Sequence, residues 1–134
     1  MKIGLDIHGV INKYPKFFSE LSKLFVENGN QIHIITGSTV KENSIYGKKN
    51  LEYLKENRIF YTHIFSIVDY HEEQGAEIVY QDAENPWIDS QLWNKTKAEY
   101  CKKHNIDIMF DDSTVYGKFF ETPFALFTSI QAEN

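Results

Sequence analysis

The sequence predicts an α/β fold with a mostly parallel sheet and helices on both faces. Short apolar runs typical of strands alternate along the chain with amphipathic stretches typical of helices. The 134 residues match one domain that can bury a core without disulfides or structural metals. Hydrophobic residues make up 42% and charged residues 25%, as in an ordinary globular protein. We therefore expect a single domain spanning residues 1–134.

Net charge and cysteine content limit the classes of protein that fit. The formal charge of -5 disfavours nucleic acid as a partner, although a local lysine patch could still steer a phosphate-bearing ligand. A single cysteine, Cys101, excludes a disulfide within the chain, and we expect it to be a buried helical residue rather than a nucleophile. No signal core or membrane-spanning run is evident, so we expect a cytoplasmic protein without a membrane partner. The oligomeric state is left open.

The elements follow in order from the apolar pattern and its breaks. In the first half, "KIGLDI" predicts a strand, a helix begins near Pro15 and stops at Gly29, "QIHIITGS" predicts a second strand, and a helix spans residues 40–56. In the second half we expect strands at "YTHIFSI", "DIMFDD" and "FALF", a short helix before Gly75, and a long helix over residues 90–104. Residues 76–89 alternate apolar and polar side chains around an Asn-Pro turn, which predicts a small inserted hairpin.

Polar side chains stand where three of these strands end. Asp6 follows the first strand, Thr36 ends the second, and Asp111 and Asp112 end the strand "DIMFDD". The carboxyl ends of parallel strands meet at one crevice, where ligands bind. These four residues are therefore candidates for one site.

Their chemistry suits phosphoryl transfer. A carboxylate can attack phosphorus and form an aspartyl-phosphate, which divides one difficult displacement into two easier steps. Magnesium relieves the repulsion between carboxylate and phosphate, and it prefers oxygen ligands such as Asp6 and Asp111. The hydroxyl of Thr36 and a lysine ammonium can hold the other phosphoryl oxygens in the transition state.

The segments "LDIHGVI", "ITGS" and "FDDS", with a lysine on a helix, resemble in order the four motifs of the haloacid-dehalogenase-like (HAD-like) hydrolases. The resemblance covers essentially the whole chain and implies a Rossmann-like fold, a magnesium cofactor and phosphomonoesterase activity. It implies that Asp6 is nucleophile and metal ligand, and that the backbone carbonyl of His8 also binds the metal. Thr36 would bind the phosphoryl group, and Asp111, with Asp112, would complete the metal site. The substrate would be a phosphorylated small molecule or a phosphorylated polymer end.

Two lysines on the helix over residues 90–104 compete for the phosphate-binding role. Residues three and four apart share a helix face, so Lys97 lies with Trp93 and Cys101 on the apolar face, which we expect to point inward. Lys95 lies on the other face. A lysine on an apolar face needs an anionic partner, which favours Lys97. Lys118, close behind the paired acids, is a third candidate.

The first motif departs from the family at His8, where an aspartate usually serves as general acid and base. Histidine can do both near neutral pH, since its unperturbed pKa is about 6.5. The substitution leaves two alternatives, a working phosphohydrolase and a catalytically weak relative that only binds phosphate and metal. A receiver domain of the signalling type is a third α/β alternative. In receivers the acid pair precedes the other motifs, whereas here it comes last, so the motif order argues against this class.

Three further expectations concern residues around the site. The chain has no room for a large cap domain, so the site should be open, and residues 76–89 could serve as a small flap. Trp93 is expected to pack rather than to stack on a substrate. Asp69 is expected to be solvated or to cap a helix, and His71 to lie on the surface.

Overall fold

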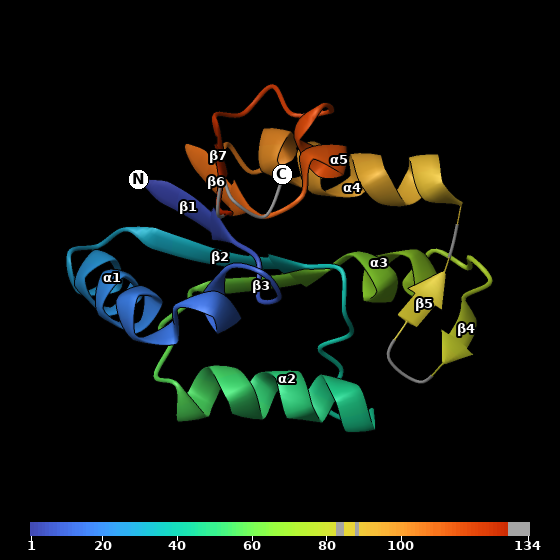
Figure 1. Cartoon of the computed structure of the whole chain (residues 1–134), viewed down its shortest axis with the longest axis horizontal. Coiled ribbons are helices and arrows are strands. Elements are labelled where there is room, and N and C mark those ends of the chain that lie inside the picture. The colour runs from blue at the N-terminus through green and yellow to red at the C-terminus, as the bar shows by residue number, and fades with distance from the viewer. Residues whose placement is uncertain (83–84, 88, 129–134) are drawn as a thin grey trace.

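The fold is described from a computed structural model that covers residues 1–82, 85–87 and 89–128. A five-stranded sheet, parallel throughout, has the strand order β3-β2-β1-β6-β7 (Figure 1). In that order the strands are β3 (His63–Ser66), β2 (Gln31–Thr36), β1 (Lys2–Leu5), β6 (Ile108–Asp111) and β7 (Phe124–Leu126). The predicted α/β class with a parallel sheet is confirmed.

Helices cover both faces of the sheet. They are η1 (Ile11–Lys13), α1 (Pro15–Glu27), α2 (Ile45–Glu56), α3 (Ile67–Glu73), α4 (Ser90–Lys103) and α5 (Thr114–Gly117). Figure 1 shows α1 and α2 below the sheet and α4 and α5 above it. The arrangement is that of a Rossmann-like fold, as the sequence predicts.

Alternating side chains of the strands form the core on each face. Ile32 and Ile34 of β2 join the cluster on the α1 and α2 side, which also holds Phe18 and Leu54. Ile35 points the other way and packs with Cys101 of α4. This is the two-residue period of a strand buried on both faces. Cys101 is fully buried, as expected.

The helix α2 begins at Ile45, five residues later than predicted. Ser44 caps it, because its hydroxyl accepts a hydrogen bond from the amide of Gly47 at 3.3 Å. Gly47 lies directly against the backbone of Lys41, where a Cβ would collide. Residues before Ser44 therefore form a loop, which the Asp69 carboxylate anchors by accepting from the amide of Val40 at 2.8 Å.

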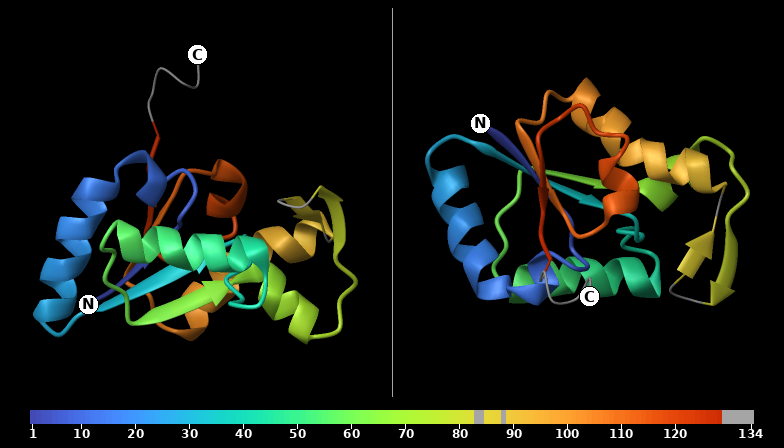
Figure 2. Two further views of the ribbon diagram at one scale, coloured as in Figure 1. Left: turned by 90° about the horizontal axis from the view of Figure 1, so that it is seen from below. Right: turned by 45° about the horizontal axis from the view of Figure 1, so that its top comes forward.

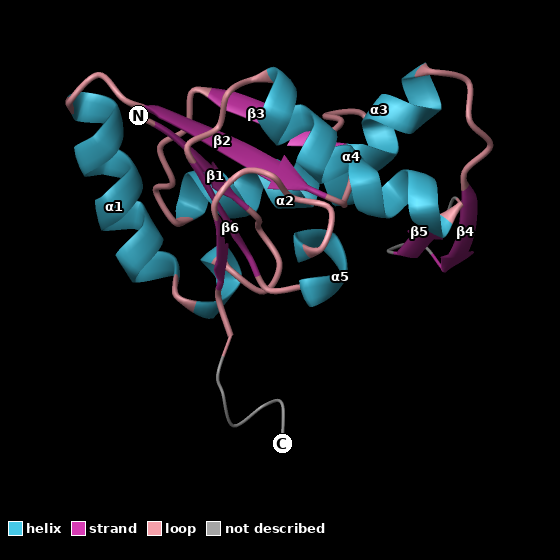
Figure 3. Ribbon diagram, turned by 90° about the horizontal axis from the view of Figure 1, so that it is seen from above, coloured by secondary structure: helices cyan, strands magenta, loops and turns pink. Residues whose placement is uncertain are grey.

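The predicted hairpin is present as a separate two-stranded antiparallel sheet, β4 (Val79–Asp82) and β5 (Asn85–Trp87). The predicted place of its turn is wrong, because Asn85 and Pro86 belong to β5 and pair with β4. The hairpin lies beyond α3 and α4, on the side of the molecule toward which β2 and β3 point (Figures 2 and 3). A flap role for residues 76–89 stays a prediction, and residues 83, 84 and 88 fall outside the described part. Among the described helices, none combines the length and apolar character needed to cross a bilayer.

A cluster of ring side chains fills the space between the sheet and the end of α4. His33 of β2 stacks on His63 of β3 with ring centroids 4.1 Å apart, and its Nδ1 lies 2.7 Å from the hydroxyl of Tyr100. Burial lowers the pKa of His33 from its usual 6.5 to about 4. The positive charges of His63, His104 and Lys2 act in the same direction.

We expect this cluster to make stability depend on pH. The unfolded chain protonates His33 below about pH 6.5, whereas the folded protein does so only near pH 4, so the free energy of unfolding should fall as pH drops through that window. Urea denaturation at a series of pH values should show a smaller fall for His33→Gln than for the unmodified protein. Equal slopes for the two proteins would show that His33 is not responsible.

Candidate active site

The register of two neighbouring strands brings two of the predicted carboxylates together. In the parallel pair of β1 and β6, Leu5 lies opposite Phe110. One residue further on, the Asp6 amide donates to the carbonyl of Phe110 at 3.3 Å, and Asp111 is the next residue of β6. Both aspartates are buried. The site therefore starts from two acids at the carboxyl ends of adjacent strands.

Lys97 of α4 reaches between these acids. Its Nζ lies 2.7 Å from Oδ2 of Asp111 and 3.1 Å from Oδ2 of Asp6, and the side chain is 1% exposed. The helix is fixed at its start by Asp89, whose carboxylate accepts from the amides of Gln91 and Leu92. The structure therefore places Lys97, as its helix face predicts, among the carboxylates.

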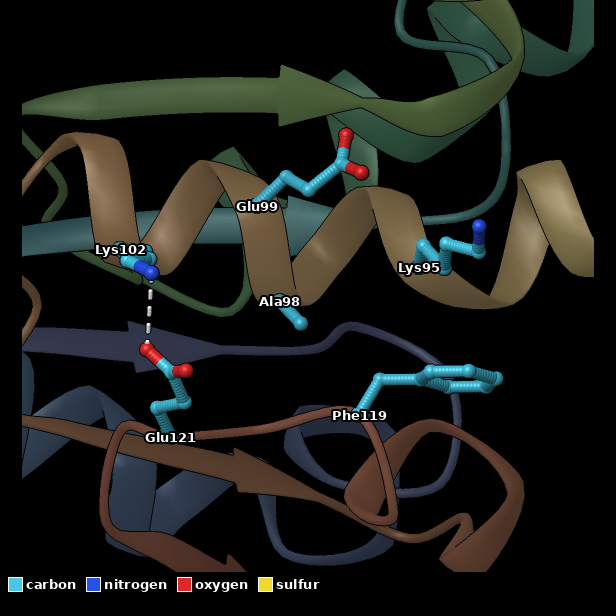
Figure 4. A pocket seen from close by; sticks show the side chains of 6 residues that line it. All are labelled: Lys95, Ala98, Glu99, Lys102, Phe119 and Glu121. Atoms are coloured by element: carbon cyan, nitrogen blue, oxygen red, sulfur yellow. Dashed lines mark ion pairs between the residues drawn. The ribbon is translucent and has the colours of Figure 1, made fainter.

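The other two lysines lie elsewhere. Lys95 is exposed and lines a groove of about 210 Å³ between α4 and residues 119–121 (Figure 4). Lys118 is also exposed, and its ammonium lies 5.5 Å from the ring centroid of Phe119. Neither position brings the lysine to Asp6 and Asp111, so the geometry favours Lys97 for the phosphate-binding role.

Backbone amides hold the remaining oxygens of the two buried acids. Oδ1 of Asp6 accepts from the amide of Ile7 at 2.8 Å, and Oδ1 of Asp111 accepts from the amide of Ser113 at 3.1 Å. Each carboxylate therefore presents one oxygen to its own turn and the other to Lys97. This bonding fixes the orientation of both groups.

Asp112 and the turn after β1 complete the cluster. Asp112 lies beyond the end of β6 and is exposed, but Asp6, Asp111 and Asp112 each have an oxygen within 4.8 Å of the others. Gly9 has φ of +84°, and a Cβ there would collide with the Asp112 carboxylate. Gly9 is thus needed both because its φ is positive and because the Asp112 carboxylate lies so close to it.

Three carboxylates and one ammonium leave this cluster with a formal charge of -2 when all are ionised. Burial raises the pKa of Asp6 to about 6; Lys97 opposes this rise, while Asp111 and Asp112 add to it. Burial also raises the pKa of Asp112. Burial alone would lower the pKa of Lys97, but the charges of Asp6 and Asp111 outweigh it and raise that pKa. With their oxygens this close together and a shortage of positive charge, Asp6, Asp111 and Asp112 could hold a metal ion.

Thr36 and His8 are connected through Ser38. Thr36 ends β2 and is fully buried, and its hydroxyl accepts from the amide of Ser38 at 3.2 Å. The Ser38 hydroxyl in turn lies 3.4 Å from Nδ1 of His8, which is exposed. The turn after β2 thus reaches the histidine of the first motif.

The expectations for Asp69 and His71 are wrong in part. Asp69 is 8% exposed rather than solvated, and its side chain fixes the loop before α2. His71 is 6% exposed, and its Nε2 lies 2.7 Å from the hydroxyl of Thr96. His71 packs against α4, whereas Asp69 lies against the loop before α2, and the sequence of so short a helix reveals neither contact.

The amino-acid sequence gives no sign of an aromatic contact that Lys97 makes at the site. The Lys97 ammonium lies 4.5 Å from the ring centroid of Tyr116 in α5. A tyrosine in a four-residue helix carries no periodic signal, so only the tertiary structure reveals this neighbour. Trp93, expected to pack, donates from Nε1 to the Tyr116 hydroxyl at 2.7 Å.

Comparisons with protein-family models, with curated proteins and with solved structures found no match for this chain.

Removing the buried ammonium should destabilise the protein. With Lys97→Met, Asp6 and Asp111 remain buried without their partner, a change that typically costs about 3–5 kcal/mol. Lys95→Met, an exposed site two residues away, should change stability by no more than about 0.5 kcal/mol. Urea denaturation at neutral pH with a metal chelator measures both. Two variants of equal stability would contradict the assigned charge balance.

Proposed function

We propose that this protein is a magnesium-dependent phosphohydrolase of the HAD-like type that cleaves phosphomonoesters through an aspartyl-phosphate at Asp6. The observation that carries the proposal is the buried Lys97 ammonium shared between Asp6 and Asp111, with Asp112 close by. Buried acids that lie close together and have a shifted pKa, as Asp6 has, are typical of functional sites. The resemblance of the four motifs supports the same reading.

Asp6, Asp111 and Asp112, with the carbonyl of His8, would hold Mg²⁺, which when bound supplies positive charge toward the phosphate. An Asp6 carboxylate oxygen forms a bond to phosphorus as the bond from phosphorus to the ester oxygen breaks. His8 gives a proton to the departing oxygen and later takes one from the water that attacks the phosphorus. Phosphate then leaves and the Asp6 carboxylate is restored. Lys97 and Thr36 hold phosphoryl oxygens during both steps.

The exposed position of His8 and Asp112 bears on the substrate. One side of the cluster meets solvent, so the leaving group can extend away from the protein. This arrangement suits a phosphorylated small molecule or the phosphorylated end of a polymer.

The Asp6→Asn variant tests the nucleophile. An amide cannot form the acyl-phosphate, so hydrolysis of para-nitrophenyl phosphate should fall to background, whereas Asp107→Asn, at the other end of β6, should keep it. Chelation should abolish turnover of the unmodified protein and added Mg²⁺ should restore it. Undiminished activity of Asp6→Asn, or activity that survives thorough chelation, would refute this assignment.

Variants of His8 test whether the departure in the first motif preserves catalysis. His8→Ala should lower kcat by roughly 10²–10⁴-fold, the usual contribution of general acid-base catalysis, and leave Mg²⁺ affinity nearly unchanged. His8→Asp should keep or raise kcat, and His63→Ala, also exposed, serves as control. Full activity of His8→Ala would remove the imidazole from the mechanism. An inert parent with an active His8→Asp would instead establish the weak relative that only binds phosphate and metal.

A further inference from the structure

The third neighbour of the Lys97 ammonium is an aromatic face. The Tyr116 ring centroid lies 4.5 Å from Nζ, while Asp6 and Asp111 accept two of its hydrogen bonds. A cation over an aromatic ring is attracted by the ring's negative face, and more strongly when water is excluded. Because Lys97 is 1% exposed, the ring limits where its ammonium can move.

The short helix that carries Tyr116 does not fix the position of its ring by itself. It belongs to α5, a helix of four residues that contains no buried residue and has no side-chain cap at its start. A single helical turn has little stability of its own. The Tyr116 hydroxyl, however, accepts a hydrogen bond of 2.7 Å from Nε1 of Trp93 in α4. Trp93 thus ties the ring to the rigid helix that carries Lys97.

Trp93 is in turn placed by the turn after β2. It precedes Lys97 by four residues, so both side chains leave the same face of α4. Its indole packs on Gly37, where an added Cβ would lie 2.8 Å from Cζ2. Gly37 directly follows Thr36. The contacts therefore run from the end of β2 through Trp93 and Tyr116 to the ammonium.

We propose that Tyr116 and Trp93 are positioning residues, which hold the Lys97 ammonium at a fixed place relative to Asp6 and to the Thr36 turn. Binding of a phosphoryl group by that ammonium rests on the proposed function, whereas its placement by the two aromatic residues is independent of the proposed function.

Amine acylation tests the placement without any assay of activity. The protein is treated with an acetylating reagent, and modification of each lysine is read by peptide mass spectrometry, with exposed Lys95 as internal reference. In Tyr116→Leu, acylation of Lys97 relative to Lys95 should rise at least about tenfold, as expected when a desolvated contact is lost. Val115→Ala, an exposed neighbour in α5, should leave the ratio unchanged. Buried Cys101 should stay unreactive toward a thiol reagent in each variant, which separates local from general opening.

Kinetics test the consequence for the reaction. With para-nitrophenyl phosphate and Mg²⁺, Tyr116→Leu should lower kcat by about 10–100-fold, the size expected when a reacting group is misplaced, with a smaller change in KM. Tyr116→Phe and Trp93→Phe remove the same hydrogen bond, so each should lower kcat several-fold, and the double variant should be no worse than the poorer single one.

Lys97 that stays protected in Tyr116→Leu, or that becomes reactive only together with Cys101, would overturn the proposal. If Tyr116→Leu does not fold, Tyr116→Phe decides, because an unchanged Lys97 ratio there would equally overturn it. If the unmodified protein hydrolyses no phosphate ester, the proposed function fails, and the acylation ratio still decides the placement.

Discussion

The buried ammonium of Lys97 must stay close to two carboxylates, and much of the surrounding structure follows from that requirement. A charge in an apolar interior is costly unless opposite charges and hydrogen bonds compensate it. Asp6 and Asp111 supply both, at 3.1 and 2.7 Å, because parallel strands β1 and β6 end side by side. The position of α4 over the sheet is therefore tied to the strand ends as well as to the core.

Lys97 compensates only part of the negative charge of the carboxylates, and this shortfall connects stability to the proposed chemistry. One ammonium faces three carboxylates, and the raised pKa of Asp6 records the cost of keeping that acid ionised. A divalent cation would remove the deficit, and a phosphoryl group could then approach. The deficit of positive charge thus favours a cation at this site, at some cost to the free protein.

The sequence predicted those parts of the fold and site that follow from local pattern. Apolar periodicity located the parallel strands, so Asp6, Thr36 and Asp111 could be assigned to strand ends, and helix periodicity separated Lys97 from Lys95. Contacts between helices and strands could not be predicted from the sequence. The ring of Tyr116 and the burial of His71 depend on tertiary packing, which leaves no periodic signal, whereas the late start of α2 at Ile45 follows from the local cap at Ser44.

In the proposed reaction, Asp6 carries the phosphoryl group during turnover. The most direct measurement is to quench the protein with acid during steady-state hydrolysis of a ³²P-labelled phosphate ester, reduce acyl-phosphates with borohydride, and find the converted residue by peptide mass spectrometry. We expect protein-bound label that depends on Mg²⁺ and reduction of Asp6 to homoserine. Turnover with no labelled protein, or with conversion at a different acid, would contradict it.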